Sequence, residues 1–165
     1  MSFLKKIFNS KEQPEVSIAA PVSGKLVPVQ DVPDETFSGE MLGKGAAIQP
    51  SEGKIFSPVD GTVTSAFSTG HALSITSVDG AEILVHVGID TVELKGKYFT
   101  KHVNEDDKVR KGDLLIEVDL EGARSEGYDM VVPVIVMNMD SFSSITVETG
   151  REIRAGEEML KLTKA

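Results

Sequence analysis

The sequence predicts an all-β protein, built from antiparallel strands with very little helix, on three observations. From Val16 onward, short runs of strand-forming residues alternate with glycine, of which the chain has 15. Asp-Gly turns occur at residues 60–61 and 79–80, and closely spaced turns are typical of sandwiches and barrels. Two pairs of segments also repeat in the same chain order. Helix is expected only within residues 120–128 and 139–144, for a turn or two each.

The chain divides into residues 1–16, a flexible or amphipathic N-terminal segment, and residues 17–165, a β-domain. In the first segment Phe3, Leu4, Ile7 and Phe8 follow helical spacing with lysines between them. Such a helix could make weak contact with an anionic membrane surface. Isolated helices this short are marginal in water, so a frayed terminus is expected in the free protein.

Internal repetition predicts a duplicated β motif. Residues 21–27 (PVSGKLV) are similar to residues 58–64 (PVDGTVT), and residues 103–118 are similar to residues 147–162. The second pair matches Gly112 with Gly156. Each copy is expected to form a turn followed by a strand, with glycine supplying a positive φ.

Composition narrows the function classes. The 165 residues suit one domain with a real core, and the net charge is −9. An acidic chain without a basic stripe is a poor nucleic-acid binder and is better suited to a basic protein patch. No cysteine is present, which excludes disulfides and thiolate metal sites. No apolar run reaches membrane-spanning length and no signal peptide is evident, so a cytoplasmic location is expected.

Residues 71–88 carry the most information about function. Two β-type runs are joined by Asp79-Gly80, the strongest short-range signal for a two-residue type I′ hairpin. Diagonal neighbours on one face of such a hairpin have Cβ atoms roughly 7–8 Å apart, which would bring His71 and His86 together. The register of this tight turn pairs Val78 with Ala81, Ile75 with Leu84, Leu73 with His86 and His71 with Gly88.

The same alternation predicts two different faces. Ile83, Val85, Val87 and Ile89 are expected in the core, whereas Leu84, Leu73 and Ile75 are expected to form an apolar surface around His86. Apolar surface around a polar group is typical of a protein-docking patch.

Two neighbouring imidazoles suit a metal or a phosphoryl group. A neutral imidazole offers one nitrogen lone pair while the other nitrogen keeps its proton, and phosphoryl transfer mainly requires positioning and charge stabilisation. We assign His86 as nucleophile and His71 as helper, with the Thr69 hydroxyl nearby and Gly88 leaving room for the incoming group. A single strand histidine is more often a surface or core residue, and spacing alone does not say which ring attacks. His102 is expected to be a solvated loop residue.

Beyond spacing, residues 83–97 (ILVHVGIDTVELKGK) resemble the phosphorylation-site signature of glucose-type enzyme IIA proteins of the bacterial phosphoenolpyruvate-dependent sugar phosphotransferase system. Further similarity extends over about residues 17–163. It is carried by residues 20–37, by SPVDGTV at 57–63, by STGHALSI at 68–75, by VPVIVMNMD at 132–140 and by ETGREIRAGEEML at 148–160.

The resemblance implies a β-sandwich with a duplicated hybrid motif and a phosphoryl group that arrives from the carrier HPr and leaves to a cysteine of a IIB permease domain. It places the phosphorylated histidine at His86, the supporting histidine at His71 and a nearby threonine at Thr69. It also implies an apolar contact ring of Phe37, Leu42, Phe67 and Leu84, with acidic contacts at Asp34 and Asp90.

The resemblance implies no required cofactor, although zinc could bind His71 and His86 with a partner's ligand. The resemblance leaves regulatory partners open. The N-terminal segment is similar to a membrane-touching tail, which could place the protein at the inner face of the membrane.

Two other classes of protein use a similar β fold. A zinc hydrolase on a similar β fold would need a third protein ligand, and the chain has no H-x-H or H-E-x-x-H motif. A biotinyl or lipoyl carrier would need a lysine at a hairpin tip in a characteristic setting, which Lys25 and Lys111 lack. The sequence names neither the sugar nor the oligomeric state, although a monomer is favoured.

Overall fold

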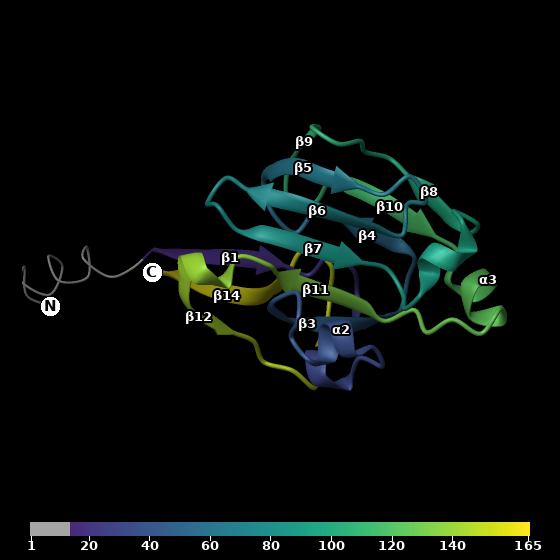
Figure 1. Cartoon of the computed structure of the whole chain (residues 1–165), viewed down its shortest axis with the longest axis horizontal. Coiled ribbons are helices and arrows are strands. Elements are labelled where there is room, and N and C mark those ends of the chain that lie inside the picture. Colours follow the sequence, from purple (N-terminus) through teal and green to yellow (C-terminus); the bar gives the residue numbers. More distant parts are fainter. Residues whose placement is uncertain (1–13) are drawn as a thin grey trace, which may run out of the picture.

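The computed structural model describes residues 14–165, in which antiparallel strands dominate (Figure 1). A large sheet has eight strands in the order β13-β2-β3-β11-β7-β6-β5-β9. Two three-stranded sheets, β1-β14-β12 and β4-β10-β8, complete the molecule. This architecture confirms the predicted antiparallel β-sandwich.

The strands of the large sheet are, in chain order, β2 (Gly24–Pro28), β3 (Lys44–Pro50), β5 (Gly61–Ala66), β6 (Ala72–Ser77), β7 (Glu82–His86), β9 (Lys108–Val109), β11 (Val132–Val136) and β13 (Glu152–Ile153). Those of the two small sheets are β1 (Glu15–Ala19), β4 (Lys54–Phe56), β8 (Phe99–Lys101), β10 (Leu114–Val118), β12 (Phe142–Thr146) and β14 (Glu158–Lys164).

The predicted duplication is visible in the strand order. From its two edges the large sheet begins with β13-β2 and with β9-β5, and these four strands come from the matching repeats. The turns match as well. The N–H of Gly112 donates to the Ser57 carbonyl, and the N–H of Gly156 donates to the Ala20 carbonyl, each at 2.9 Å. Both glycines have a φ of 94°, as expected for a turn that only glycine adopts without strain.

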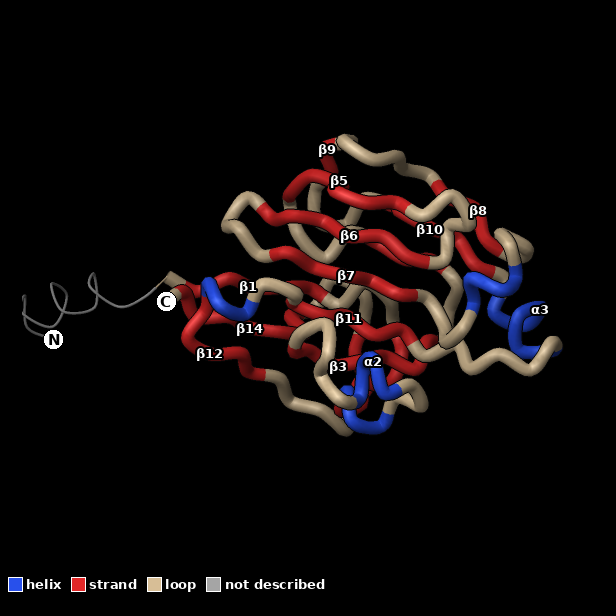
Figure 2. The backbone as a smooth tube through the Cα atoms, viewed as in Figure 1, coloured by secondary structure: helices blue, strands red, loops and turns tan. Residues whose placement is uncertain are grey.

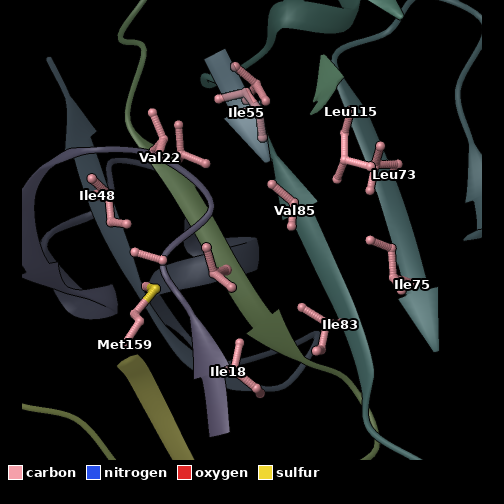
Figure 3. Packing of buried hydrophobic residues seen from close by; sticks show 14 of the residues in the cluster. Ile18, Val22, Ile48, Ile55, Leu73, Ile75, Ile83, Val85, Leu115 and Met159 are labelled. Atoms are coloured by element: carbon pink, nitrogen blue, oxygen red, sulfur yellow. The ribbon is translucent and has the colours of Figure 1, made fainter. Parts of the chain in front are cut away.

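The main core lies between the large sheet and the two small sheets. Figure 3 shows Leu73, Ile75, Ile83 and Val85 pointing from β6 and β7 into this core, where all four are fully buried. Burying an aliphatic side chain of this size stabilises the fold by roughly 1.5–3 kcal/mol relative to leaving it exposed. The alternation of these side chains therefore fixes which face of β7 turns outward.

A second, smaller cluster covers part of the outer face of the large sheet. It packs Val29, Val32 and Phe37 against outward side chains of β3, β7 and β11, including Leu84 and Ile135. Strand β11 is buried throughout, which accounts for its continuous apolar sequence VPVIV. The segment carrying Phe37 thus places an aromatic ring beside the end of β7.

Helix is scarce, as Figure 2 shows. The helices are η1 (Val29–Asp31), α2 (Glu35–Ser38), η2 (Thr91–Leu94), α3 (Leu120–Ser125) and η3 (Met139–Ser141). The two predicted helical segments appear as α3 and η3, although residues 142–144 belong to β12. Helix α2 was not predicted. Its N-cap Asp34 accepts a hydrogen bond from the Thr36 N–H, the usual role of aspartate at that position.

The N-terminal prediction lies mostly outside the described residues, so the amphipathic segment stays a prediction. Strand β1 begins at Glu15, two residues before the predicted start of the β-domain. Within residues 14–165, no helix is both long and apolar enough to cross a bilayer.

Candidate functional site

His86 ends strand β7 on the outer face of the large sheet, opposite Ala72 of β6. Its Nδ1 lies 2.6 Å from the carbonyl oxygen of Gly88. A carbonyl oxygen can only accept a hydrogen bond, so Nδ1 carries the proton. In the neutral ring the lone pair is therefore on Nε2. The ring is partly exposed. Its tautomer is compatible with nucleophilic attack by Nε2.

The backbone after β7 is shaped by glycine. Gly88 has a φ of 83°, in the left-handed region that glycine tolerates. A Cβ at this position would lie 2.5 Å from Cγ2 of Thr91 and 2.9 Å from Sδ of Met130. The predicted role of Gly88, to leave room for an incoming group, is therefore wrong. The space is filled by the protein, and Gly88 instead supplies the carbonyl that holds the His86 proton.

His71 lies immediately before β6 and its ring meets that of His86. The two ring centroids are 5.1 Å apart with the planes at 78°. Gly70, with a φ of 76°, turns the chain at this point. Nδ1 of His71 is hydrogen-bonded to the Thr69 hydroxyl, and the Phe67 ring lies 5.1 Å from the imidazole. The residue is only 3% exposed, so it is enclosed more completely than a freely solvated helper would be.

The predicted hairpin is present, but its register is shifted by one residue. Ile75 pairs with Ile83 and Leu73 with Val85, because the loop contains Val78 as well as Asp79 and Gly80. The Gly80 N–H donates to the Ser77 carbonyl at 2.9 Å, and Gly80 has a φ of 90°. These features define a three-residue loop, a type I turn followed by a left-handed residue.

Two predictions change with this register. Leu73 and Ile75 are in the core and not on the surface around His86. His71 is not opposite Gly88. Instead its carbonyl accepts the Val87 N–H at 2.7 Å. The two imidazoles still meet because His71 lies outside β6. The alternation of side chains along that strand therefore does not decide which way the His71 ring points.

Both imidazoles are held in the neutral form near pH 7. Burial, and then the neighbouring His86, lower the pKa of His71 from 6.5 to about 4. Burial also lowers the pKa of His86, while the Gly88 carbonyl and the carboxylates of Asp34 and Asp90 act in the opposite direction. A neutral His86 keeps its lone pair for attack, and a neutral His71 adds no positive charge beside it.

The lowered pKa of His71 predicts a loss of stability in acid. Below pH 6.5 the unfolded chain binds a proton at His71 that the folded chain does not bind until about pH 4, so the free energy of unfolding falls as the pH decreases through this interval. The full shift corresponds to about 3 kcal/mol. Urea unfolding at pH 7 and pH 4.5 should show a larger loss for the wild type than for His71→Gln. Equal losses would contradict the assignment.

The predicted contact residues differ in how exposed they are. Phe37 is buried with its ring centroid 5.1 Å from that of His86. Leu84 is also buried, so its predicted place on an exposed apolar surface is wrong, because it packs in the outer cluster with Phe37. Leu42 and Phe67 are exposed. Of the acidic residues, Asp34 caps α2 and Asp90 is exposed.

Sequence reasoning missed two exposed apolar side chains in the same segments. They are Met41, which precedes Leu42 and is 74% exposed, and Val92, two residues after Asp90. An apolar residue between polar loop residues, as in Asp-Thr-Val-Glu, was the available signal. The third histidine, His102, is exposed and hydrogen-bonded to Glu117 at 2.7 Å, in agreement with its assignment as a loop residue.

Comparison with known proteins identifies the family. The family described as "phosphoenolpyruvate-dependent sugar phosphotransferase system, EIIA 1" matches residues 16–142. The chain belongs to this family. The predicted family, fold and activity class, a phosphoryl-carrying component of the phosphotransferase system, are thereby confirmed. The hydrolase and the biotinyl or lipoyl alternatives receive no support.

Some relatives of this EIIA chain have about its own length, and others are several times longer. It is 43% identical to the glucose-specific EIIA component of Haemophilus influenzae, with 99% of each chain covered. It is 45% identical to the beta-glucoside-specific EIIBCA component of Halalkalibacterium halodurans, covering 89% of this chain and 23% of that protein. The solved structure of glucose permease IIA from Mycoplasma capricolum superposes with a TM-score of 0.83 at 33% identity, covering 98% and 99% of the two chains.

Proposed function

We propose that His86 is the residue of this EIIA chain that is phosphorylated, with Nε2 as the attacking atom. The observation that carries the proposal is the hydrogen bond from Nδ1 to the Gly88 carbonyl, which leaves the lone pair on Nε2. His71 lacks such an assignment, because a hydroxyl such as that of Thr69 can donate or accept. His71 is also the more enclosed ring. Of the two rings, His86 is therefore the better nucleophile.

The proposed donor is the phosphohistidine of HPr, and the proposed acceptor is a cysteine of a IIB domain. In the first step the Nε2 lone pair forms the bond to phosphorus. The bond between phosphorus and the donor's imidazole nitrogen breaks, and that nitrogen retains the electron pair. The Nδ1 proton stays on His86, held by Gly88. In the second step the IIB thiolate attacks phosphorus and the electron pair returns to Nε2. EIIBCA relatives, whose names join A to B and C components, support a IIB acceptor.

His71 and Thr69 are proposed to stabilise the transferred group. If the Thr69 hydroxyl donates to Nδ1 of His71, Nε2 of that ring carries a proton and can donate to a phosphoryl oxygen. The 5.1 Å separation of the ring centroids supports a donor beside the proposed phosphoryl site. A preorganised donor that is aimed at developing charge stabilises the transition state more than the same donor would in water.

Docking is proposed to use the apolar residues around the pair, with acidic residues at their edge. Phe67 and Leu42 supply exposed apolar surface. Asp34 and Asp90 lie close enough to His86 to influence its pKa, so they could meet arginines of a basic partner. Charges at an interface edge mainly raise the association rate and make it salt-dependent.

A charge-only substitution tests this docking role. Asparagine can replace Asp34 as an N-cap and can replace Asp90 at its φ of 58°. The double variant Asp34→Asn/Asp90→Asn should therefore keep its fold and associate with the donor several-fold more slowly at low salt, and the difference should shrink at high salt. Asp79→Asn, at the opposite end of the β6–β7 hairpin, is the control. Equal association rates for all three proteins would refute the docking role, and stopped-flow mixing measures them.

Zinc binding is proposed only together with a partner. Neutral imidazole is a good zinc ligand, but zinc in proteins usually takes four ligands. Within residues 14–165, no group of three or more histidine, cysteine or acidic side chains could hold a metal ion. The His71–His86 pair would thus provide half of a site. Regulatory partners and a cytoplasmic location, with weak membrane contact through residues 1–16, likewise remain proposals.

The experiment that tests the proposed function is phosphorylation in a reconstituted chain. The protein is incubated with phosphoenolpyruvate, the first enzyme of the system and HPr, and the added mass is located by peptide mapping. We expect one acid-labile, base-stable phosphoryl group in the peptide that contains His86, formed only when HPr is present. A phosphoryl group in the peptide that contains His71 would reverse the assignment.

A further inference from the structure

We infer that Thr91 is a positioning residue for phosphoryl transfer, whose hydroxyl fixes the peptide that aims the Gly88 carbonyl at His86. The inference rests on the proposed function of His86. Thr91 is completely buried and opens η2. Its hydroxyl donates to the Val87 carbonyl at 2.6 Å. Within residues 14–165 the Thr91 hydroxyl is not hydrogen-bonded to either imidazole, so the proposed effect of Thr91 acts through the backbone at Val87 and Gly88.

The peptide unit that joins Val87 to Gly88 is held at both ends. Its carbonyl accepts from the Thr91 hydroxyl at 2.6 Å, and its N–H donates to the Val131 carbonyl at 3.0 Å. The carbonyl and N–H of a trans peptide point in opposite directions. Two bonds on opposite edges therefore prevent the plane from rotating.

The next peptide unit carries the functional carbonyl. The N–H of Ile89 donates to the Asp129 carbonyl at 2.8 Å, so the Gly88 carbonyl on the other edge of that plane points toward His86 Nδ1. Glycine itself imposes little restraint on its φ and ψ. The orientation of this carbonyl is thus set by its neighbours, and Thr91 provides the side-chain hydrogen bond among them.

Thr91 is also linked to the second histidine, through the hydrogen bonds of Val87. The Val87 N–H donates to the His71 carbonyl at 2.7 Å, while the Val87 carbonyl is held by Thr91. A rotation of the backbone at Val87 would disturb the segments that carry both imidazoles. The Thr91 methyl group has a separate role, since Cγ2 lies where a side chain on Gly88 would have to fit.

Matched substitutions separate the hydroxyl from the methyl group. Thr91→Val keeps the shape and removes the donor, whereas Thr91→Ser keeps the donor and removes the methyl group. Nitrogen-15 NMR of the imidazoles in the unphosphorylated protein reports the His86 tautomer, and transfer from phosphorylated HPr reports the rate. We expect Thr91→Val to populate the Nε2-protonated form and to accept the phosphoryl group about tenfold more slowly. Thr91→Ser should stay within about twofold of the wild type.

The inference is overturned if Thr91→Val keeps both the wild-type tautomer and the wild-type rate. If Thr91→Val does not fold, Thr91→Ala replaces it in the comparison with Thr91→Ser, and equal rates for those two variants would overturn the inference. A failure of the proposed function would give a different result from a failure of this inference. In that case the wild type is not phosphorylated at His86, while the tautomer comparison still tests what Thr91 does to the ring.

Discussion

His86→Gln is expected to abolish phosphoryl acceptance, whereas His71→Gln is expected to accept the group and pass it on slowly. Glutamine has no nitrogen lone pair that can attack phosphorus, so the covalent step is lost with His86. Loss of His71 removes one donor beside the phosphoryl group, which we expect to slow onward transfer by roughly 10²–10³-fold. Radiolabel transfer from phosphorylated HPr measures acceptance, and transfer to a IIB domain measures the second step.

The third histidine offers a matched control. His102 is exposed, and within residues 14–165 its imidazole is hydrogen-bonded only to Glu117, so His102→Gln should accept and transfer the phosphoryl group at the wild-type rate. The assignment would be reversed if His86→Gln still took up label and His71→Gln did not. If only His102→Gln lost acceptance, the roles assigned to His86 and to His71 would both be wrong.

Gly88→Ala is expected to damage both stability and phosphorylation. Its φ of 83° costs an L-residue roughly 1–2 kcal/mol. The new methyl group would also overlap the Thr91 methyl and the Met130 sulfur, and such overpacking costs typically about 1–3 kcal/mol. Urea unfolding should therefore show a loss of about 2–5 kcal/mol. Phosphoryl acceptance should fall in the folded fraction, because the Gly88 carbonyl moves away from Nδ1.

Gly112→Ala separates strain from overlap. Gly112 has a similar φ of 94°, but a Cβ there would meet nothing within 4 Å, and the residue lies in the turn between β9 and β10. It should lose only the roughly 1–2 kcal/mol of backbone strain and keep its phosphorylation rate. Equal losses of stability at the two glycines would show that the space beside Gly88 is not filled as the structure describes.

The hairpin shows which part of the fold the sequence could predict. Asp79-Gly80 correctly indicated a tight connection, but the same dipeptide closes both two-residue and three-residue loops. Hydrophobic pairing could have decided between them. With the observed register Ile75 is opposite Ile83, and both are fully buried. The predicted register would have placed Ile75 opposite Leu84 of the other face. Val78, 78% exposed, is the additional loop residue.

The site was predicted in part. The proximity of His71 and His86 followed from the hairpin together with the family resemblance, although the register was wrong. The contacts made by the His86 ring could not be predicted from local sequence patterns. The bond from His86 to the Gly88 carbonyl requires a left-handed glycine whose neighbours are fixed by residues 129–131, about forty positions away in sequence. The packing of Phe37 over His86 requires the fold of the segment between β2 and β3.

In the proposed mechanism, Nε2 of His86 attacks phosphorus because Nδ1 is occupied by its proton and the Gly88 carbonyl. Nitrogen-15 and phosphorus-31 NMR of the phosphorylated protein, labelled at histidine, identify the nitrogen that is bonded to phosphorus. We expect the bond at Nε2 of His86, with the Nδ1 proton still present. Phosphorus on Nδ1 of His86, or on either nitrogen of His71, would contradict this account.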